Sequence, residues 1–204
     1  MLRFYKSSSL REGRIGILPG AFNPPTKAHV ALARAASEQH DLAQIVFLLP
    51  EQFPHKPYTG ASFHDRLAML RDACGDDPTL AIASCEQGLF IDIARAFRIE
   101  CGPRVEICLL CGKDAAERIV HWDYGDGPSF REQLEEFRLL VASRQGEYQA
   151  PCGYEGKIGL IALPAAWDEV SSSTVREAIA AGRPWRHGVE EAVARRIEQR
   201  GIYG

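Results

Sequence analysis

The first segment that could do chemistry is residues 20–29, GAFNPPTKAH, which joins a short apolar run to an alanine-rich stretch. A glycine at the end of a strand lets the backbone approach a ligand, and a helix that follows offers unpaired amides and a positive dipole end. Thr26 and His29 are three residues apart at this helix start, so both can face one anion. The segment is neither a G-x-G-x-x-G nor a Walker loop. It predicts a phosphate site, although a proline-rich turn capped by Thr26 explains the same residues.

The second segment is residues 171–177, SSSTVRE, near the C-terminal end of the sequence. Thr174 and Glu177 have the spacing of a capping box, and Gly182 can stop the helix, so the hydroxyls have a purely structural explanation. Arg176 is not explained in this way, because the dipole at the start of a helix favours acidic residues. An anion held at this helix start would account for the arginine.

Six cysteines could suggest a disulfide framework or a metal site. Without a secretory signal they are better interpreted as reduced thiols. Cys108 and Cys111 form a C-x-x-C pair inside an apolar run, and residues three apart on a strand face opposite sides, which is poor geometry for zinc. We therefore expect core thiols and no metal ligands, which disfavours a thiol-redox or zinc protein.

The elements that must position these segments alternate along the chain. Short apolar runs predict buried parallel strands, and stretches with one apolar face predict helices. Strands that alternate with helices predict an α/β fold, a Rossmann-like, doubly wound and mostly parallel sheet with helices on both faces and ligands at the carboxyl ends of the strands. The predicted strands are 15–18, 44–49, 80–83, 105–110, 137–142 and 158–163, and the predicted helices are 29–40, 62–73, 91–99, 130–136, 174–181 and 189–200.

Composition limits the remaining classes. The 204 residues are 46% hydrophobic and 25% charged, which predicts one globular domain over residues 1–204. The formal net charge of −3 disfavours nucleic-acid and acidic-membrane partners. The sequence has neither a signal peptide nor an apolar run long enough to span a membrane, so we expect a cytoplasmic protein. The oligomeric state stays open, a homo-oligomer included.

Together the two segments resemble the nucleotidyltransferase superfamily marked by G-x-F-x-P-x-[HT]-x-x-H and [ST]-[ST]-T-x-x-R. Further landmarks are similar to those of the nicotinate or nicotinamide mononucleotide adenylyltransferases. They appear in that family's order along nearly the whole chain: PHK at 54–56, RLAML at 66–70, LCGKD at 110–114, Trp122, SRQG at 143–146, and the ending 189–203.

The resemblance implies transfer of an adenylyl group from ATP, with Mg²⁺, to the 5′-phosphate of a pyridine mononucleotide, with release of pyrophosphate. It implies that His29 and Thr26 donate to the reacting phosphates and that Arg176 holds the β- and γ-phosphates. It implies that Asp114 binds ribose hydroxyls, unless Asp114 only caps a helix. Nucleotide-binding residues carried over in this way are Gly20, Ala21, Phe22, Lys56, Gly112, Asp114, Arg144, Ser172, Ser173 and Thr174.

The residues that would face the acceptor base depart from the family's pattern. Trp122 could stack on a pyridine ring, or it could be an indole packed in the core or against the nearby loop. Residues 89–93, LFIDI, stand where the pyridine enzymes carry a hydroxyl-rich segment, and Phe90 could supply a stacking face there. Two alternatives follow: the same chemistry on another phosphorylated acceptor, a cytidylyltransferase included, or a nucleotide-binding module that does not turn over.

Overall fold

The computed structural model describes residues 1–6, 12–51, 60–86, 88–143, 148–154 and 156–204. In chain order its elements are β1 Leu2–Lys6, β2 Gly13–Pro19, α1 Lys27–His40, β3 Gln44–Pro50, α2 Phe63–Cys74, β4 Leu80–Cys85, α3 Phe90–Cys101, β5 Val105–Gly112, α4 Lys113–Val120, α5 Phe130–Gln133, β6 Arg138–Ser143, β7 Ile158–Ala162, the 3₁₀ helix η1 Ala165–Trp167, α6 Ser172–Ala180, the 3₁₀ helix η2 Arg186–Gly188 and α7 Glu191–Arg200.

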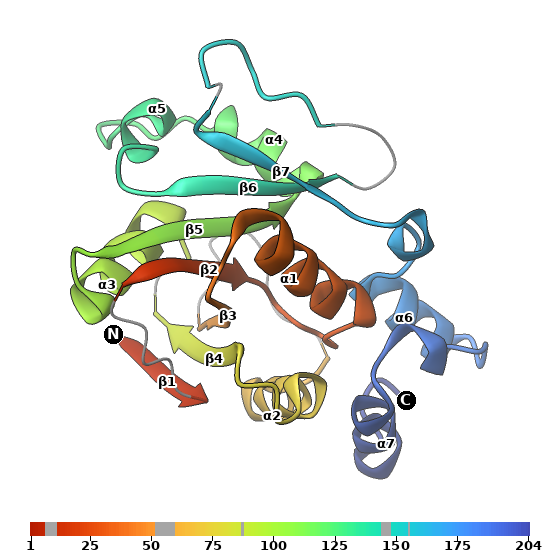
Figure 1. The fold of residues 1–204 in the computed structure, drawn as a ribbon. Coiled ribbons are helices and arrows are strands. Elements are labelled where there is room, and N and C mark those ends of the chain that lie inside the picture. The colour runs from red at the N-terminus through yellow and green to blue at the C-terminus, as the bar shows by residue number, and fades with distance from the viewer. Residues whose placement is uncertain (7–11, 52–59, 87, 144–147, 155) are drawn as a thin grey trace.

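The strands form one sheet in the order β1-β4-β3-β2-β5-β6-β7 (Figure 1). All neighbouring strands from β4 to β7 are parallel, and β1 lies antiparallel to β4 at the edge. The predicted doubly wound, mostly parallel α/β sheet is therefore confirmed. The chain reverses its direction of winding between β2 and β5, and in such sheets ligands bind outside the carboxyl ends of the strands at this switch point.

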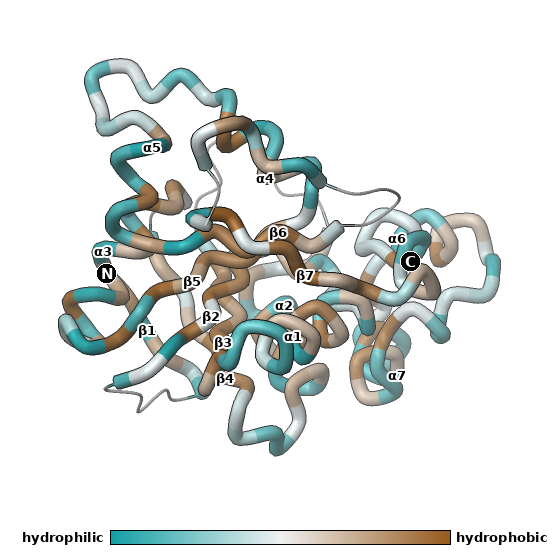
Figure 2. Tube along the Cα trace, turned by 45° about the horizontal axis from the view of Figure 1, so that its top comes forward, coloured by the Kyte–Doolittle hydropathy of each residue, from teal (hydrophilic) through white to brown (hydrophobic). Residues whose placement is uncertain are grey.

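Helices cover both faces of the sheet, as expected. Helices α1 and α2 pack on one face, whereas α3 and α4 pack on the other. Alternate residues of each strand enter opposite clusters, because successive side chains on a strand point to opposite sides. Cys108 and Cys111 enter opposite clusters in this way, which confirms that the C-x-x-C pair has no shared face. Figure 2 shows the resulting apolar strands in the middle of the molecule.

A third, smaller core joins the C-terminal helices to α2. It contains Met69 from α2, Val175 from α6 and Val193 and Ile197 from α7. Asp72 of α2 also pairs with Arg196 of α7. In Figure 1 these C-terminal helices are drawn in blue at the lower right. In the part of the chain that the structure describes, every helix is too short or too polar to cross a membrane.

Several element boundaries differ from the predictions. Helix α6 begins at Ser172, because the Ser171 hydroxyl accepts the Thr174 N–H and caps the helix. The predicted capping box of Thr174 with Glu177 is therefore wrong. Helix α1 begins at Lys27 rather than at residue 29, and α5 has four residues instead of the seven predicted over 130–136.

One strand and one α-helix were not predicted at all, nor were the two 3₁₀ helices. Strand β1 is a short edge strand with charged residues, so its sequence carries no apolar run. Helix α4 buries only Ala116 completely, and one buried side chain makes no apolar stripe.

Candidate active site

The loop of residues 20–25 leaves β2 at the switch point and is fixed by a buried phenylalanine. The Gly20 N–H donates to the carbonyl of Leu48 at 3.0 Å. Phe22 has φ of +46° and is 1% exposed, and its ring lies over Gly20, where an added Cβ would meet the ring at 2.9 Å. Glycine at position 20 is therefore required by the close approach of this ring. Phe22 and Gly20 together shape the loop.

Thr26 and His29 are brought together at the first turn of α1, as predicted. The Thr26 N–H donates to His29 Nδ1 at 3.0 Å, and Thr26 Oγ1 lies 2.7 Å from the same nitrogen. A backbone N–H can only donate, so Nδ1 is the acceptor and the proton of the neutral ring resides on Nε2. The edge of the ring also contacts Phe22, with centroids 5.2 Å apart. His29 is thus an oriented donor, and Thr26, which is buried, is both the helix N-cap and the group that orients it.

Helix α6 is hydrogen-bonded to this loop through two side chains. The Ser172 hydroxyl donates to the carbonyl of Pro24 at 2.7 Å, and Arg176 Nη1 donates to the carbonyl of Asn23 at 2.6 Å. Arg176 Nη2 also donates to Ser173 Oγ at 3.3 Å. The sequence indicated that Arg176 lies in the first turn of this helix. Because the helix begins at Ser172, Arg176 lies in its second turn instead. The N-terminal ends of α1 and α6, together with the Arg176 guanidinium, therefore meet at one loop.

The hydroxyl of Thr174 is engaged within its own helix cap. It accepts from the Ser171 N–H at 3.0 Å and lies 3.1 Å from the carbonyl of Glu169, to which it donates. Its structural role is therefore established. Ser173 is exposed beside Arg176 and offers its hydroxyl at the surface.

Three residues that the sequence analysis did not single out make hydrogen bonds that hold the loop of residues 20–25 in place. Arg66 of α2 is 3% exposed and donates through Nη1 to the carbonyl of Ala21 at 3.0 Å. The Asn23 Oδ1 accepts from the Ala61 N–H at 3.3 Å and from the Tyr203 hydroxyl at 2.6 Å. Arg66, Asn23 and Tyr203 all lie within segments that resemble the family, but no local spacing indicates these contacts.

Gly112 and Asp114 stand at the end of β5, level with the loop. Ile17 of β2 pairs with Leu109 of β5, so Gly20 and Gly112 are each three residues beyond the same rung of the sheet. Gly112 is the N-cap of α4 and Asp114 is exposed in its first turn. Asp114 is therefore not the cap, which removes the structural alternative and leaves its carboxylate open to a ligand.

The two aromatic residues predicted for the acceptor differ in exposure. Trp122 follows α4 and is 46% exposed, which excludes an indole packed in the core but not one packed against the nearby loop. Phe90, the first residue of α3, is half-buried and packs edge-on to Phe137 with centroids 6.4 Å apart. Packing against the core accounts for much of this ring. Two other predicted residues, Lys56 and Arg144, lie outside the described residues.

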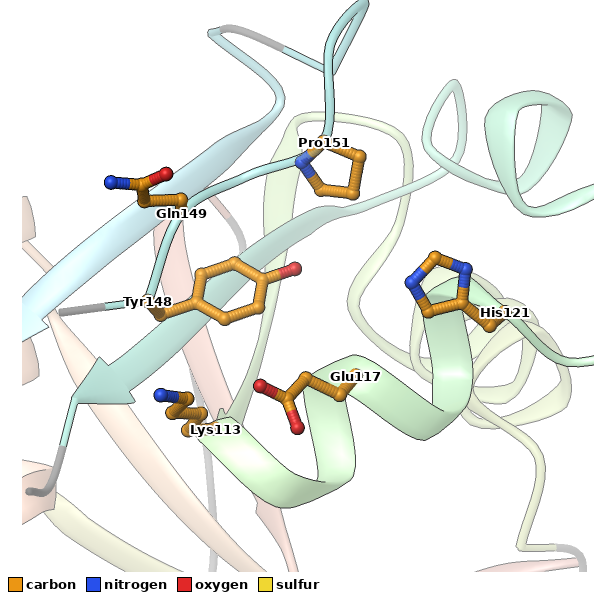
Figure 3. A pocket seen from close by; sticks show the side chains of 6 residues that line it. All are labelled: Lys113, Glu117, His121, Tyr148, Gln149 and Pro151. Atoms are coloured by element: carbon orange, nitrogen blue, oxygen red, sulfur yellow. The ribbon is translucent and has the colours of Figure 1, made fainter. Parts of the chain in front are cut away.

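A hollow of about 460 Å³ lies beside α4 (Figure 3). Its lining contains none of the predicted site residues. Tyr148 is 4% exposed and its hydroxyl has no hydrogen-bond partner among the described residues. Burial raises the pKa of this phenol. The lining residues are Lys113, Glu117, His121, Tyr148, Gln149 and Pro151.

Comparison with known proteins adds family evidence to this geometry. The cytidylyltransferase-like family matches residues 17–178. A probable nicotinate-nucleotide adenylyltransferase from Gloeobacter violaceus is 32% identical, with 93% of this chain and 96% of the relative covered. One of the same name from Moorella thermoacetica is 29% identical, with 95% and 93% covered.

Solved structures agree in fold. The Plasmodium falciparum nicotinic acid mononucleotide adenylyltransferase complexed with NaAD superposes with a TM-score of 0.75 at 18% identity, and the match covers 94% of this chain and 98% of that one. At this identity the likeness establishes the fold alone.

Proposed function

The chain belongs to the cytidylyltransferase-like family, and from this premise we propose that it transfers the adenylyl group of ATP to the 5′-phosphate of nicotinate mononucleotide, forming the dinucleotide and releasing pyrophosphate. The observation that carries the proposal is the junction of α1 and α6, where an oriented imidazole donor and a guanidinium are fixed by the same loop. The acceptor is taken from the relatives, which are named for nicotinate nucleotide.

The reaction needs alignment and charge stabilisation more than acid–base chemistry. An oxygen of the acceptor's 5′-phosphate attacks the α-phosphorus of ATP, and the bond from that phosphorus to the α,β-bridging oxygen breaks. The phosphate is already anionic, so no proton has to be removed from it. Catalysis then consists of holding two polyanions in line and stabilising charge at the α-phosphate and on pyrophosphate.

The described residues divide this work. His29 donates from Nε2 to the α-phosphate, and Thr26 holds its ring in the tautomer that does so. Arg176, with Ser172 and Ser173, binds the β- and γ-phosphates near the helix N-termini, which favour anions. At the end of β5, Asp114 accepts hydrogen bonds from ribose hydroxyls.

The remaining roles concern the acceptor and the parts of the site outside the described residues. Trp122 stacks on the pyridine ring. The proposal also includes Lys56 and Arg144 as phosphate contacts, on the resemblance alone.

Mg²⁺ enters with ATP as part of the substrate. No group of three or more His, Cys, Asp or Glu side chains in the described ranges could hold a metal ion. We propose that the ion is held chiefly by phosphate oxygens and water, as Mg²⁺ commonly is beside nucleotides. A cytoplasmic location is part of the same proposal, supported by six cysteines that are all free thiols.

The test is an acceptor panel with identification of the product. Purified protein is incubated with ATP, Mg²⁺ and one acceptor per reaction: nicotinate mononucleotide, nicotinamide mononucleotide or another phosphorylated compound. The product is identified by mass spectrometry. We expect pyrophosphate and the nicotinate dinucleotide in equal amounts. Binding of ATP without any turnover would favour a regulatory module instead.

A second candidate is the same transfer to a different phosphorylated acceptor. The start of α3 favours this candidate. Its N-cap residue, Leu89, makes no side-chain hydrogen bond, and Phe90 packs against Phe137. Neither residue offers a hydroxyl to an acceptor base. Turnover only with a non-pyridine acceptor in the panel would select this candidate.

A further inference from the structure

The C-terminal turn reaches back to the loop of residues 20–25. After α7 the chain turns through Gly201 and Tyr203, which both have positive φ, and the Ile202 N–H donates to the carbonyl of Ile197 at 3.0 Å. This turn places the Tyr203 hydroxyl 2.6 Å from Asn23 Oδ1. The two residues are 180 positions apart in the sequence.

Asn23 connects that hydroxyl to the proposed phosphate site. Its side-chain oxygen accepts from Tyr203 and from the Ala61 N–H, and its carbonyl accepts from Arg176 at 2.6 Å. Asn23 is itself 6% exposed. The side chain that Tyr203 holds and the carbonyl that holds Arg176 therefore belong to one buried residue.

Close packing leaves little freedom around this contact. Gly60 has φ of +107°, and a Cβ added there would lie 3.1 Å from the Tyr203 ring and 3.3 Å from Asn23 Nδ2. Burial raises the pKa of Tyr203, so its hydroxyl keeps its proton near neutral pH and acts as a donor. A donor held in a tight site can fix its acceptor in one orientation.

We propose that Tyr203 is a positioning residue for adenylyl transfer: its hydroxyl, acting through Asn23, sets the place of the loop carbonyl that holds Arg176. This inference rests on the proposed function. Tyr203 does not touch the reacting atoms, so its effect belongs to the alignment of the ATP phosphates and not to the acceptor. Small misplacements of groups that align substrates are costly to rate.

Tyr203→Phe tests the proposal, because it removes one hydroxyl and keeps the ring. We expect kcat/KM for ATP to fall roughly tenfold while KM for nicotinate mononucleotide stays within about twofold. The matched control is Tyr5→Phe on the edge strand β1, which removes a hydroxyl that lies 3.4 Å from Ser84 Oγ of β4. It should leave both constants unchanged. Wild-type kinetic constants after Tyr203→Phe, with only a lower melting temperature, would overturn the proposal in favour of a purely structural role.

A double-mutant cycle separates positioning through Asn23 from any other route. In an Asn23→Ala background, Tyr203→Phe should cause no further loss in kcat/KM for ATP, because the acceptor of the hydrogen bond is already gone. Losses that simply multiply would contradict the proposed route.

Calorimetric ATP affinity provides a readout without turnover. We expect Tyr203→Phe to weaken ATP binding and Tyr5→Phe to leave it unchanged; equal affinity in wild type and Tyr203→Phe would count against the proposal. If wild-type protein formed no dinucleotide, the proposed function would fail, and the affinities would still decide the role of Tyr203.

Discussion

The imidazole of His29 has its proton assigned by its neighbour. Because the Thr26 N–H occupies Nδ1, Nε2 is the donor, and a neutral ring can already donate to a phosphate. We expect His29→Ala to lower kcat by at least roughly 100-fold, the scale of losing one transition-state donor, while the protein stays folded. Steady-state turnover with ATP and nicotinate mononucleotide measures this.

His187 is exposed, so His187→Ala serves as the control for removing a histidine side chain. Turnover of His29→Ala close to that of the control would remove His29 from the reaction.

Substitutions at Trp122 test whether this side chain stacks on the acceptor base. Trp122 is 46% exposed after α4, so its truncation removes an aromatic face that a ligand can reach. We expect Trp122→Ala to raise KM for the mononucleotide, whereas Trp122→Phe restores part of the loss and neither changes KM for ATP. Acceptor titrations at saturating ATP measure the effect. An unchanged acceptor KM in the alanine variant would return Trp122 to a structural role.

Sequence reasoning identified the residues of the candidate site that belong to short motifs and missed those held by distant contacts. Thr26 and His29 are three positions apart, so their contact is local and was expected. Arg66 and Tyr203 reach the loop from 45 and 180 positions away, and nothing in their own surroundings indicates that approach. Arg176 was identified, but through a helix start placed two residues late.

Helix α6 is held to the loop by Ser172 and Arg176, so the helix and the loop form one surface, which we propose binds the ATP phosphates. We expect Arg176→Ala to raise KM for ATP and to slow the reverse reaction with pyrophosphate, with little effect on acceptor KM. Arg176→Lys should recover only part of the activity, because an ammonium cannot reproduce the two-pronged contact to Asn23 and Ser173.

Both directions of the reaction are measured with each Arg176 variant. An acceptor KM that rises as much as the ATP KM would place Arg176 elsewhere in the site.

The same comparison of elements explains which boundaries the sequence could not predict. The cap of α6 depends on Ser171 rather than Thr174, a choice between adjacent hydroxyl residues that local spacing does not decide. Helix α4 and strand β1 have weak apolar patterns, whereas the central strands are buried on both faces and were all found.

At the scale of the whole molecule, two cores on opposite faces of the sheet protect most of the thiols. Burial raises the pKa of Cys74, Cys85, Cys108 and Cys111 to about 12 from an ordinary value of 9.0. With the pKa raised this far, the fraction of each thiol present as reactive thiolate near pH 8 falls roughly a thousandfold. We therefore expect the native protein to expose one fast thiol, Cys152, and the denatured protein all six. A dithionitrobenzoate titration counts them, and two or more fast native thiols would contradict this packing.

The same burial has a consequence for stability at alkaline pH. A thiol whose pKa is raised on folding binds its proton more tightly in the folded state, so its contribution is complete below pH 9 and is lost as pH rises toward 12. We expect the free energy of unfolding to fall above pH 9, measured by urea titration at a series of pH values. A free energy that rises over this range would contradict the assigned burial.

Alternation of strands and helices was enough to predict a parallel, doubly wound sheet, but not the order of its strands. That order places the switch point between β2 and β5 and so brings residues 20–29 level with Gly112. It depends on contacts across the whole chain, which composition and periodicity do not encode.

Labelled ATP tests whether the adenylyl group passes directly between two bound substrates. Protein is mixed with nicotinate mononucleotide, Mg²⁺ and ATP labelled at the α-phosphate, then with ATP labelled at the γ-phosphate, and the reaction is stopped at early times. We predict that the α label appears in the dinucleotide, the γ label in pyrophosphate, and neither on the protein. Label retained on the protein, or an α label released as AMP without dinucleotide, would contradict the account.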